Sequence, residues 1–291
     1  MRLALMTESL KPFVGQKESI RLIKKMGFDA VDISLTKAWV ANELDPEIFD
    51  GDYIKHAKEI RKLADELDIP IIQSHAPFPV HRDNDDEYNS NMIVMLKKCI
   101  EVCGILGVKN LVIHPWNNWN AAENALFFKK LLPLAKEKNV TICTENMWNW
   151  DYENNHVLPA ACYSPEDFLE HIKEVNDDNF KACVDVGHAN MFSSINKNIT
   201  PGNMVRTLNK YVGCFHIHDN DGFKDLHATP FTMSLDWLDL AKAIKEINYK
   251  GDFVIEIAGM RNGTLEEMIK YDLLQVEAGR KFIKMIEENI N

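Results

Sequence analysis

The sequence lacks the features that mark several large classes of protein. It has no run of 18 apolar residues, which predicts that no helix spans a membrane. It also lacks low-complexity tracts and linkers rich in Gly, Pro or Ser, so we expect one domain over residues 1–291. The N-terminus has one basic residue, Arg2, before strand-like sequence, with no long apolar segment and no cleavage site. We therefore expect a cytoplasmic protein.

Positive charge is also scarce. The 33 Lys and Arg residues stand against 44 Asp and Glu, which gives a net charge of −11. Phosphate backbones are bound by Lys and Arg, so a nucleic acid is not the expected partner. Cysteine is present, but Cys143, Cys183 and Cys214 lie in apolar, strand-like runs of a chain without a secretory signal. The six cysteines are therefore predicted to be reduced and buried.

Apolar runs rich in β-branched residues alternate with stretches of helical periodicity along the whole chain. The predicted strands span 2–7, 30–35, 70–75, 110–114, 140–145, 180–185, 212–218 and 252–257. Helical spacing of apolar residues is clearest over 54–67, 92–103, 125–135 and 273–286. Such βα units with near-continuously apolar strands indicate a parallel sheet covered by helices.

This alternation predicts an α/β protein whose strands close into a (β/α)8 TIM barrel. The competing architecture is a doubly wound open sheet. That fold normally carries a glycine-rich phosphate turn after its first strand, and the segment TESLKP after the first run is not one. A single (β/α)8 barrel domain is therefore the prediction.

Residues able to bind a metal stand where the predicted strands end. In a barrel, these carboxyl ends form the rim that carries active sites. The residues at the last inward positions are His75, His114, Glu145, Asp185, His216 and Glu256. The loops and the seventh run add His188, His218, Asp225 and His227. Each alone could be a satisfied core residue, but several carboxylates converging on one rim would repel one another without a cation. We therefore predict a bound divalent metal.

The types of ligand limit the identity of that metal. Glu145, Asp185, His216 and Glu256 offer three carboxylates and one imidazole, a set that suits Mn, Zn, Fe or Co. His75 and His114 could hold a second ion together with Glu145. His188, Asp225 and His227 could hold a third. The expected cofactor is thus one to three divalent ions per chain.

These motifs resemble the xylose-isomerase-like barrel superfamily, which includes sugar and sugar-phosphate isomerases and epimerases and the endonuclease IV type of apurinic endonuclease. The shared segments are SHAPF, VIHPW, TENM, VDVGHAN, HIHDNDG, DLH and VIEI. In the isomerase branch, the resemblance implies that Glu145, Asp185, His216 and Glu256 hold one catalytic metal and that His188 contacts substrate. In the endonuclease branch, it implies that those four hold the middle of three zinc ions. His75 and His114 would then hold a second zinc with Glu145, and His188, Asp225 and His227 would hold the third.

The residues around the ligands differ from the endonuclease pattern. The endonucleases have an Arg where Leu226 stands, a Thr-Cys pair where Val186 and Gly187 stand, and an Asn where His218 stands. The loop LTKAWVANELDPEIFDG is also acidic, a poor surface for DNA. These departures favour the sugar branch.

The loops suggest how a small polyol could be bound. Trp116 and Trp148 could stack on a sugar, with Trp119 and Trp150 beside them. Lys224 could meet a phosphate or carboxylate of the substrate, and His188 could orient a hydroxyl. The expected ligand is therefore a sugar or sugar phosphate. The sequence leaves both a monomer and a homo-oligomer open.

The expected chemistry is proton transfer through an enediolate, with Glu145 and Glu256 as general bases and His188 orienting the substrate. Return of the proton to the opposite face of the same carbon gives an epimerase, whereas return to the neighbouring carbon gives an isomerase. Two alternatives remain. A three-metal centre would act as a phosphodiesterase of the endonuclease IV type, and a barrel without turnover would be a carbohydrate sensor.

Overall fold

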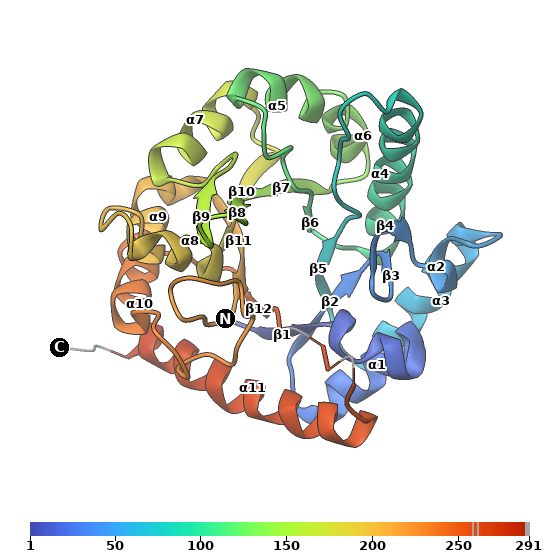
Figure 1. Cartoon of the computed structure of the whole chain (residues 1–291). Coiled ribbons are helices and arrows are strands. Elements are labelled where there is room, and N and C mark those ends of the chain that lie inside the picture. The colour runs from blue at the N-terminus through green and yellow to red at the C-terminus, as the bar shows by residue number, and fades with distance from the viewer. Residues whose placement is uncertain (258, 261, 289–291) are drawn as a thin grey trace.

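The strands predicted from the sequence form a closed barrel. The computed structural model describes residues 1–257, 259–260 and 262–288, so residues 258, 261 and 289–291 of the predicted domain lie outside the described residues. The barrel strands are β1 (Leu3–Met6), β2 (Ala30–Ser34), β5 (Ile71–His75), β6 (Asn110–Val112), β7 (Thr141–Glu145), β10 (Phe180–Asp185), β11 (Val212–Ile217) and β12 (Phe253–Ile255). They pair in parallel in the order β1-β12-β11-β10-β7-β6-β5-β2 and return to β1. Figure 1 shows this ring with the helices around it, which confirms the TIM barrel.

The helices follow the strands in the predicted alternation. They are α1 (Lys11–Met26), α2 (Pro46–Phe49), α3 (Tyr53–Glu66), α4 (Asp86–Leu106), α5 (Ala121–Phe128), α6 (Leu132–Glu137), α7 (Pro165–Val175), α8 (Val186–Ser193), α9 (Pro201–Leu208), α10 (Trp237–Glu246) and α11 (Leu265–Glu287), with short 3-10 helices at Thr7–Ser9 and Asn209–Tyr211. The predicted helix over 125–135 is in fact split between α5 and α6. Pro133 lies in the first turn of α6, and because it has no N–H and its ring clashes with a preceding carbonyl, it ends the earlier helix. Within the described residues, no helix combines the length and the apolar character needed to cross a membrane.

Two small hairpins were not predicted. The first pairs β3 (Thr36–Lys37) with β4 (Val40–Leu44), and the second pairs β8 (Trp148–Asp151) with β9 (His156–Pro159). They follow β2 and β7, so both rise from the rim where those strands end. Figure 1 places them on opposite sides of the ring. The hairpins therefore flank the predicted site.

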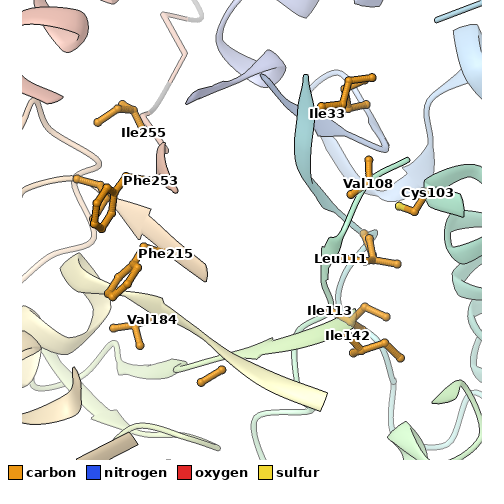
Figure 2. Packing of buried hydrophobic residues seen from close by; sticks show 14 of the residues in the cluster. Ile33, Cys103, Val108, Leu111, Ile113, Ile142, Val184, Phe215, Phe253 and Ile255 are labelled. Atoms are coloured by element: carbon orange, nitrogen blue, oxygen red, sulfur yellow. The ribbon is translucent and has the colours of Figure 1, made fainter. Parts of the chain in front are cut away.

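The outward faces of the strands pack against the helices. Ile33, Leu111 and Phe215 are completely buried members of one large hydrophobic cluster. Figure 2 shows these side chains together with Cys103, which α4 contributes to the same layer. Since side chains alternate along a strand, the residues between them face the interior of the barrel.

The barrel interior holds small side chains below its mouth. Val112, Cys143, Cys183 and Cys214 form a separate buried cluster on adjacent strands. All six cysteines of the chain are free thiols and buried, as predicted. Two residues further along each of these strands, the next side chain that faces the interior is polar. This change marks the floor of the candidate site.

Candidate metal centre

Four potential ligands come from four neighbouring strands. Glu145 and Asp185 are the last residues of β7 and β10, His216 lies in β11, and Glu256 directly follows β12. Each stands two residues after a side chain of the interior clusters, so the period of the strand points all four into the barrel mouth. One ligand atom from each lies within 4.8 Å of the others. The geometry therefore brings the predicted principal set together.

The centre of this set contains buried atoms without partners. The Nδ1 atom of His216 lies 3.3 Å from an oxygen of Glu145 and 3.2 Å from an oxygen of Glu256. Glu145 Oε2 and His216 Nδ1 are buried, and neither has a hydrogen-bond partner among the described residues. Buried polar atoms are rarely left unpaired, because desolvation without a partner is costly. A divalent ion between these atoms would satisfy them, so the donor set fits a metal.

The charges of the metal-free protein agree with this interpretation. Burial opposes ionisation of Glu145, but His216, His114 and His75 together outweigh burial and hold the pKa of Glu145 well below its usual range. Burial favours neutral His216, but Glu256 and Glu145 prevail and raise the pKa of His216 well above its usual value. For Asp185, burial raises the pKa, but His188 and His218 together outweigh burial and lower the pKa to about 2. In the absence of metal, His216 therefore takes up a proton that a metal ion would displace.

A second group of potential ligands shares Glu145 with the first. The Nε2 atoms of His75 and His114 lie 3.0 Å apart, at 3.8 Å and 3.4 Å from the same oxygen of Glu145. His75 is the last residue of β5. His114 was predicted to end its strand, which is wrong, because β6 ends at Val112. His114 lies two residues beyond the strand and therefore enters the site from a loop.

A third group lies on the other side of the mouth. It contains His188, Asp225 and His227, and His218 lies with them. One oxygen of Asp225 is 3.1 Å from His227 Nε2 and 3.5 Å from His188 Nε2. Burial opposes ionisation of Asp225, but His227 and His188 hold the pKa of Asp225 well below its usual range. The structure thus brings together all three sets of potential ligands that the sequence suggested.

Main-chain carbonyls orient three of the imidazoles. The Nδ1 atom of His75 lies 2.8 Å from the carbonyl oxygen of Ala76. The Nδ1 atoms of His188 and His227 lie 2.9 Å and 3.1 Å from the carbonyl oxygens of Asn146 and Glu256. A carbonyl only accepts, so the Nδ1 atom of each ring carries the proton and donates it. The Nε2 atom of each ring is then left to face the mouth. Metal-binding histidines are usually held in this way.

A cavity of about 680 Å³ opens above these residues. This volume lies within the range of small-molecule sites. His75, His114, Glu145, His188 and Glu256 contribute to its floor. Its walls include Trp148, Trp150, Tyr152 and Leu158 from the second hairpin. A second cavity of about 240 Å³ adjoins the first hairpin and shares His75, Phe78 and Glu256 with the first cavity.

The predicted substrate contacts do not all reach this cavity. Trp148 and His188 line it, with ring centroids 6.3 Å apart. Trp116 instead packs on the hydrophobic core, with its ring 5.4 Å from His81. Lys224 is exposed in the turn after Asp221, whose side chain accepts from the Lys224 backbone N–H. Neither Trp116 nor Lys224 lines the cavity, because loop packing directs them elsewhere.

Some lining residues had no role in the sequence-based prediction. Phe78 stacks on His114 at a centroid distance of 4.5 Å and lines both cavities. Phe78 belongs to the SHAPF segment, and its position three residues after His75 could have indicated that it lies near the site. Tyr152 reaches the cavity only through the turn of the second hairpin. The hairpin itself was not predicted from the sequence, and neither was the position of Tyr152.

Comparison with known proteins identifies the family of the chain. The family described as xylose isomerase-like TIM barrel matches residues 20–283. An uncharacterised protein of Methanocaldococcus jannaschii is 25% identical over 236 residues, covering 76% of each chain. A D-psicose 3-epimerase of Agrobacterium fabrum is 24% identical over 157 residues, which cover 54% of this chain and 48% of that protein.

Solved structures share the same fold. A D-tagatose 3-epimerase-like protein superimposes with a TM-score of 0.75 at 20% identity, covering 99% of this chain and 98% of that one. The IolI protein, solved with a bound zinc atom, gives a TM-score of 0.74 at 19% identity with full coverage of both chains. At these identities the likeness establishes the barrel.

Proposed function

Because this chain belongs to the xylose isomerase-like TIM barrel family, we propose that it is a divalent-metal-dependent isomerase or epimerase of a sugar or sugar phosphate. The observation that carries the proposal is the convergence of Glu145, Asp185, His216 and Glu256 on one point below a cavity of sugar size. The epimerase among its sequence relatives supports a sugar substrate. The zinc in a protein of the same fold supports a metal.

The proposed role of the metal follows from its position on the cavity floor. Held by the four residues, a Mn, Zn, Co or Fe ion would polarise a substrate carbonyl and acidify the adjacent C–H. Three carboxylates leave the site net negative, which favours a divalent cation over a neutral arrangement of side chains. The other two groups of ligands leave room for one to three ions.

Glu145 and Glu256 are the proposed bases. Their oxygens lie on either side of His216 Nδ1, at 3.3 Å and 3.2 Å. One carboxylate would remove the proton next to the carbonyl, which gives an enediolate, and the other would return it. Return to the opposite face of the same carbon inverts its configuration. Return to the neighbouring carbon interconverts an aldose and a ketose.

Other residues of the cavity would position the substrate. The Nδ1 proton of His188 is engaged by the Asn146 carbonyl, so Nε2 is the ring atom left to meet a hydroxyl. Trp148, Trp150 and Tyr152 form an aromatic wall that suits the C–H faces of a sugar. Because these three residues belong to the second hairpin, that hairpin would also limit access of water to the enediolate.

The test is isotope exchange. We expect wild-type protein to incorporate deuterium from solvent into a ketose substrate, and Glu145→Gln and Glu256→Gln each to lower exchange by at least 100-fold, the order of magnitude of general acid–base catalysis. Metal content should fall less than exchange does. Glu137→Gln, which changes an exposed acid on α6, is the matched control and should exchange like wild type. Exchange retained by both active-site variants would refute the assignment of the bases.

The second candidate is a multi-zinc phosphodiesterase of the endonuclease IV type. The observation in its favour is that the groups around His75 and His227 lie on either side of the principal set. The acidic loop after β2 argues against binding to DNA. Cleavage of an abasic duplex at catalytic rates, lost in His227→Ala, would favour this candidate. Binding of a sugar without turnover would favour a sensor.

The setting of the enzyme is also part of the proposal. The six free, buried thiols are consistent with a reducing compartment, so we keep the cytoplasm as the proposed location. A small-molecule ligand remains the proposed partner.

A further inference from the structure

His218 is a buried histidine that the proposed mechanism does not use. It directly follows β11 and is completely buried. Its Nε2 atom lies 3.0 Å from each oxygen of Asp185. Oδ1 of Asp185 also accepts the backbone N–H of His188 at 2.7 Å, so the carboxylate is the hydrogen-bond acceptor in this arrangement. The Nε2 atom of His218 therefore carries a proton and donates it to Asp185.

The ring of His218 fits only because position 187 has no side chain. A Cβ atom at Gly187 would lie 1.9 Å from Cε1 of His218 and 2.6 Å from its Nε2. Real Cβ contacts are never so short, so a side chain at 187 and the imidazole at 218 exclude each other. Gly187 lies in the first turn of α8, directly after the strand that ends in Asp185.

A second residue also packs on the ring. His218 stacks on His227 with centroids 4.1 Å apart and an angle of 13° between the planes. The imidazole thus contacts both Gly187 and His227, which leaves it little freedom to rotate. Its Nδ1 atom is buried and has no hydrogen-bond partner in the part of the chain that the structure describes. Its Nε2 atom lies 3.9 Å from Asp225 but 3.0 Å from Asp185, so the shorter contact with Asp185 defines its orientation.

Asp185 depends on this contact for the orientation of its carboxylate. The backbone N–H of His188 donates to Oδ1 at 2.7 Å, as the N-cap interaction of α8. That bond holds one oxygen and leaves the group free to turn about it. The bond from His218 reaches both oxygens and fixes the plane of the carboxylate. Hydrogen-bond partners of metal ligands commonly contribute 10-fold to 100-fold in metal affinity.

We infer that His218 is a positioning residue, admitted by Gly187, that orients Asp185 for the metal ion of the proposed centre. The inference rests on the proposed function, because Asp185 needs this orientation only if it binds a metal. In this inference His218 donates a hydrogen bond to Asp185 and does not itself bind the metal ion. It also assigns to Gly187 a role that no other residue type can fill.

The test is the affinity of the metal-free protein for Co²⁺, measured by visible absorption without any substrate. In His218→Leu, which cannot donate, we expect the affinity to fall about 10-fold to 100-fold. His218→Gln keeps an N–H at the same reach and should recover most of the loss. Gly187→Ala keeps the histidine but displaces its ring, so it should lose as much as His218→Leu. Adding Gly187→Ala to His218→Leu should cost little more, because no ring remains to collide.

The control is His171→Leu, which removes a buried histidine of α7 and should bind Co²⁺ like wild type. Circular dichroism tests whether each variant is folded. If His218→Leu is unfolded, the affinities of His218→Gln and Gly187→Ala decide whether the inference holds. Affinities of His218→Leu or Gly187→Ala within about twofold of wild type overturn the inference. Failure of wild type to bind Co²⁺ overturns the proposed metal centre instead, and the inference with it. Nitrogen-15 spectra of the metal-free protein should also show the His218 proton on Nε2, and a proton on Nδ1 alone would contradict the assignment.

Discussion

At the scale of single residues, the orientation of the imidazoles decides what the barrel mouth can bind. The Nδ1 atoms of His75, His188 and His227 donate to main-chain carbonyls. Their Nε2 atoms therefore face the mouth without any rearrangement when a ligand arrives. A site prepared in this way loses little conformational freedom on binding.

The pH dependence of stability follows from the same residues. Burial favours neutral His227, but Asp225 prevails and raises the pKa of His227 from 6.5 to about 10 in the metal-free protein. The folded chain thus holds this proton more tightly than the unfolded chain does. The resulting stability is fully present below about pH 6.5 and is lost as the pH rises toward 10.

We therefore predict that the free energy of unfolding of the metal-free protein falls between about pH 7 and pH 10. The measurement is guanidinium unfolding at a series of pH values. The fall should become shallower in His227→Gln, which cannot take up the proton. A wild-type stability that is flat or rising over this range would contradict the prediction.

The identity of the ligands could be predicted from the sequence, whereas their contacts could not. Glu145, Asp185 and His216 are visible as polar residues at the ends of apolar runs. The relation between Gly187 and His218 depends on how α8 packs beside β11, and no local pattern contains that information. The two positions were nevertheless already notable as departures from the endonuclease pattern. The structure shows that they share one space.

At the scale of elements, the strands were predictable and the rim hairpins were not. Buried strands are apolar on both faces, which makes them conspicuous over five or six residues. The hairpins are short and half-buried, and their pairing depends on contact with the rim. For this reason the sequence did not distinguish Trp116 from Trp148 as a substrate contact. Of the two, only Trp148 lies on a hairpin that lines the cavity.

The outer layer that supports β12 gives a stability prediction. Phe253 is completely buried, and its ring lies 5.3 Å from Phe215 of β11 and 5.4 Å from Phe282 of α11. Phe253→Ala should lower the free energy of unfolding by about 3–5 kcal/mol, because it leaves a cavity between sheet and helix. Leu126→Ala, at a side chain that is 66% exposed, should cost less than about 0.5 kcal/mol. Guanidinium unfolding of both variants is the measurement, and equal costs would contradict the packing described.

At the scale of the whole molecule, ring closure brings the site together. The first and last strands pair through Leu3 and Phe253, and the carboxylate of Asp252 binds Arg2 at 2.6 Å beside that junction. Strands β7, β10, β11 and β12 follow one another around the closed ring, and Glu145 and Glu256 from the two outer strands of this set both approach the imidazole of His216. The alternation of strands and helices predicted this closure, because parallel strands that are all covered by helices leave few other architectures.

The central claim is that this mouth holds a divalent ion through residues of four adjacent strands. The most direct test is elemental analysis of protein without a chelating tag, stripped with EDTA, reloaded with Mn²⁺ and freed of excess metal. We predict one ion per wild-type chain and a loss of most of it in His216→Ala, with His171→Ala retaining the wild-type content. A wild-type chain that keeps no ion, or a His216→Ala chain that keeps as much as wild type, would contradict the account.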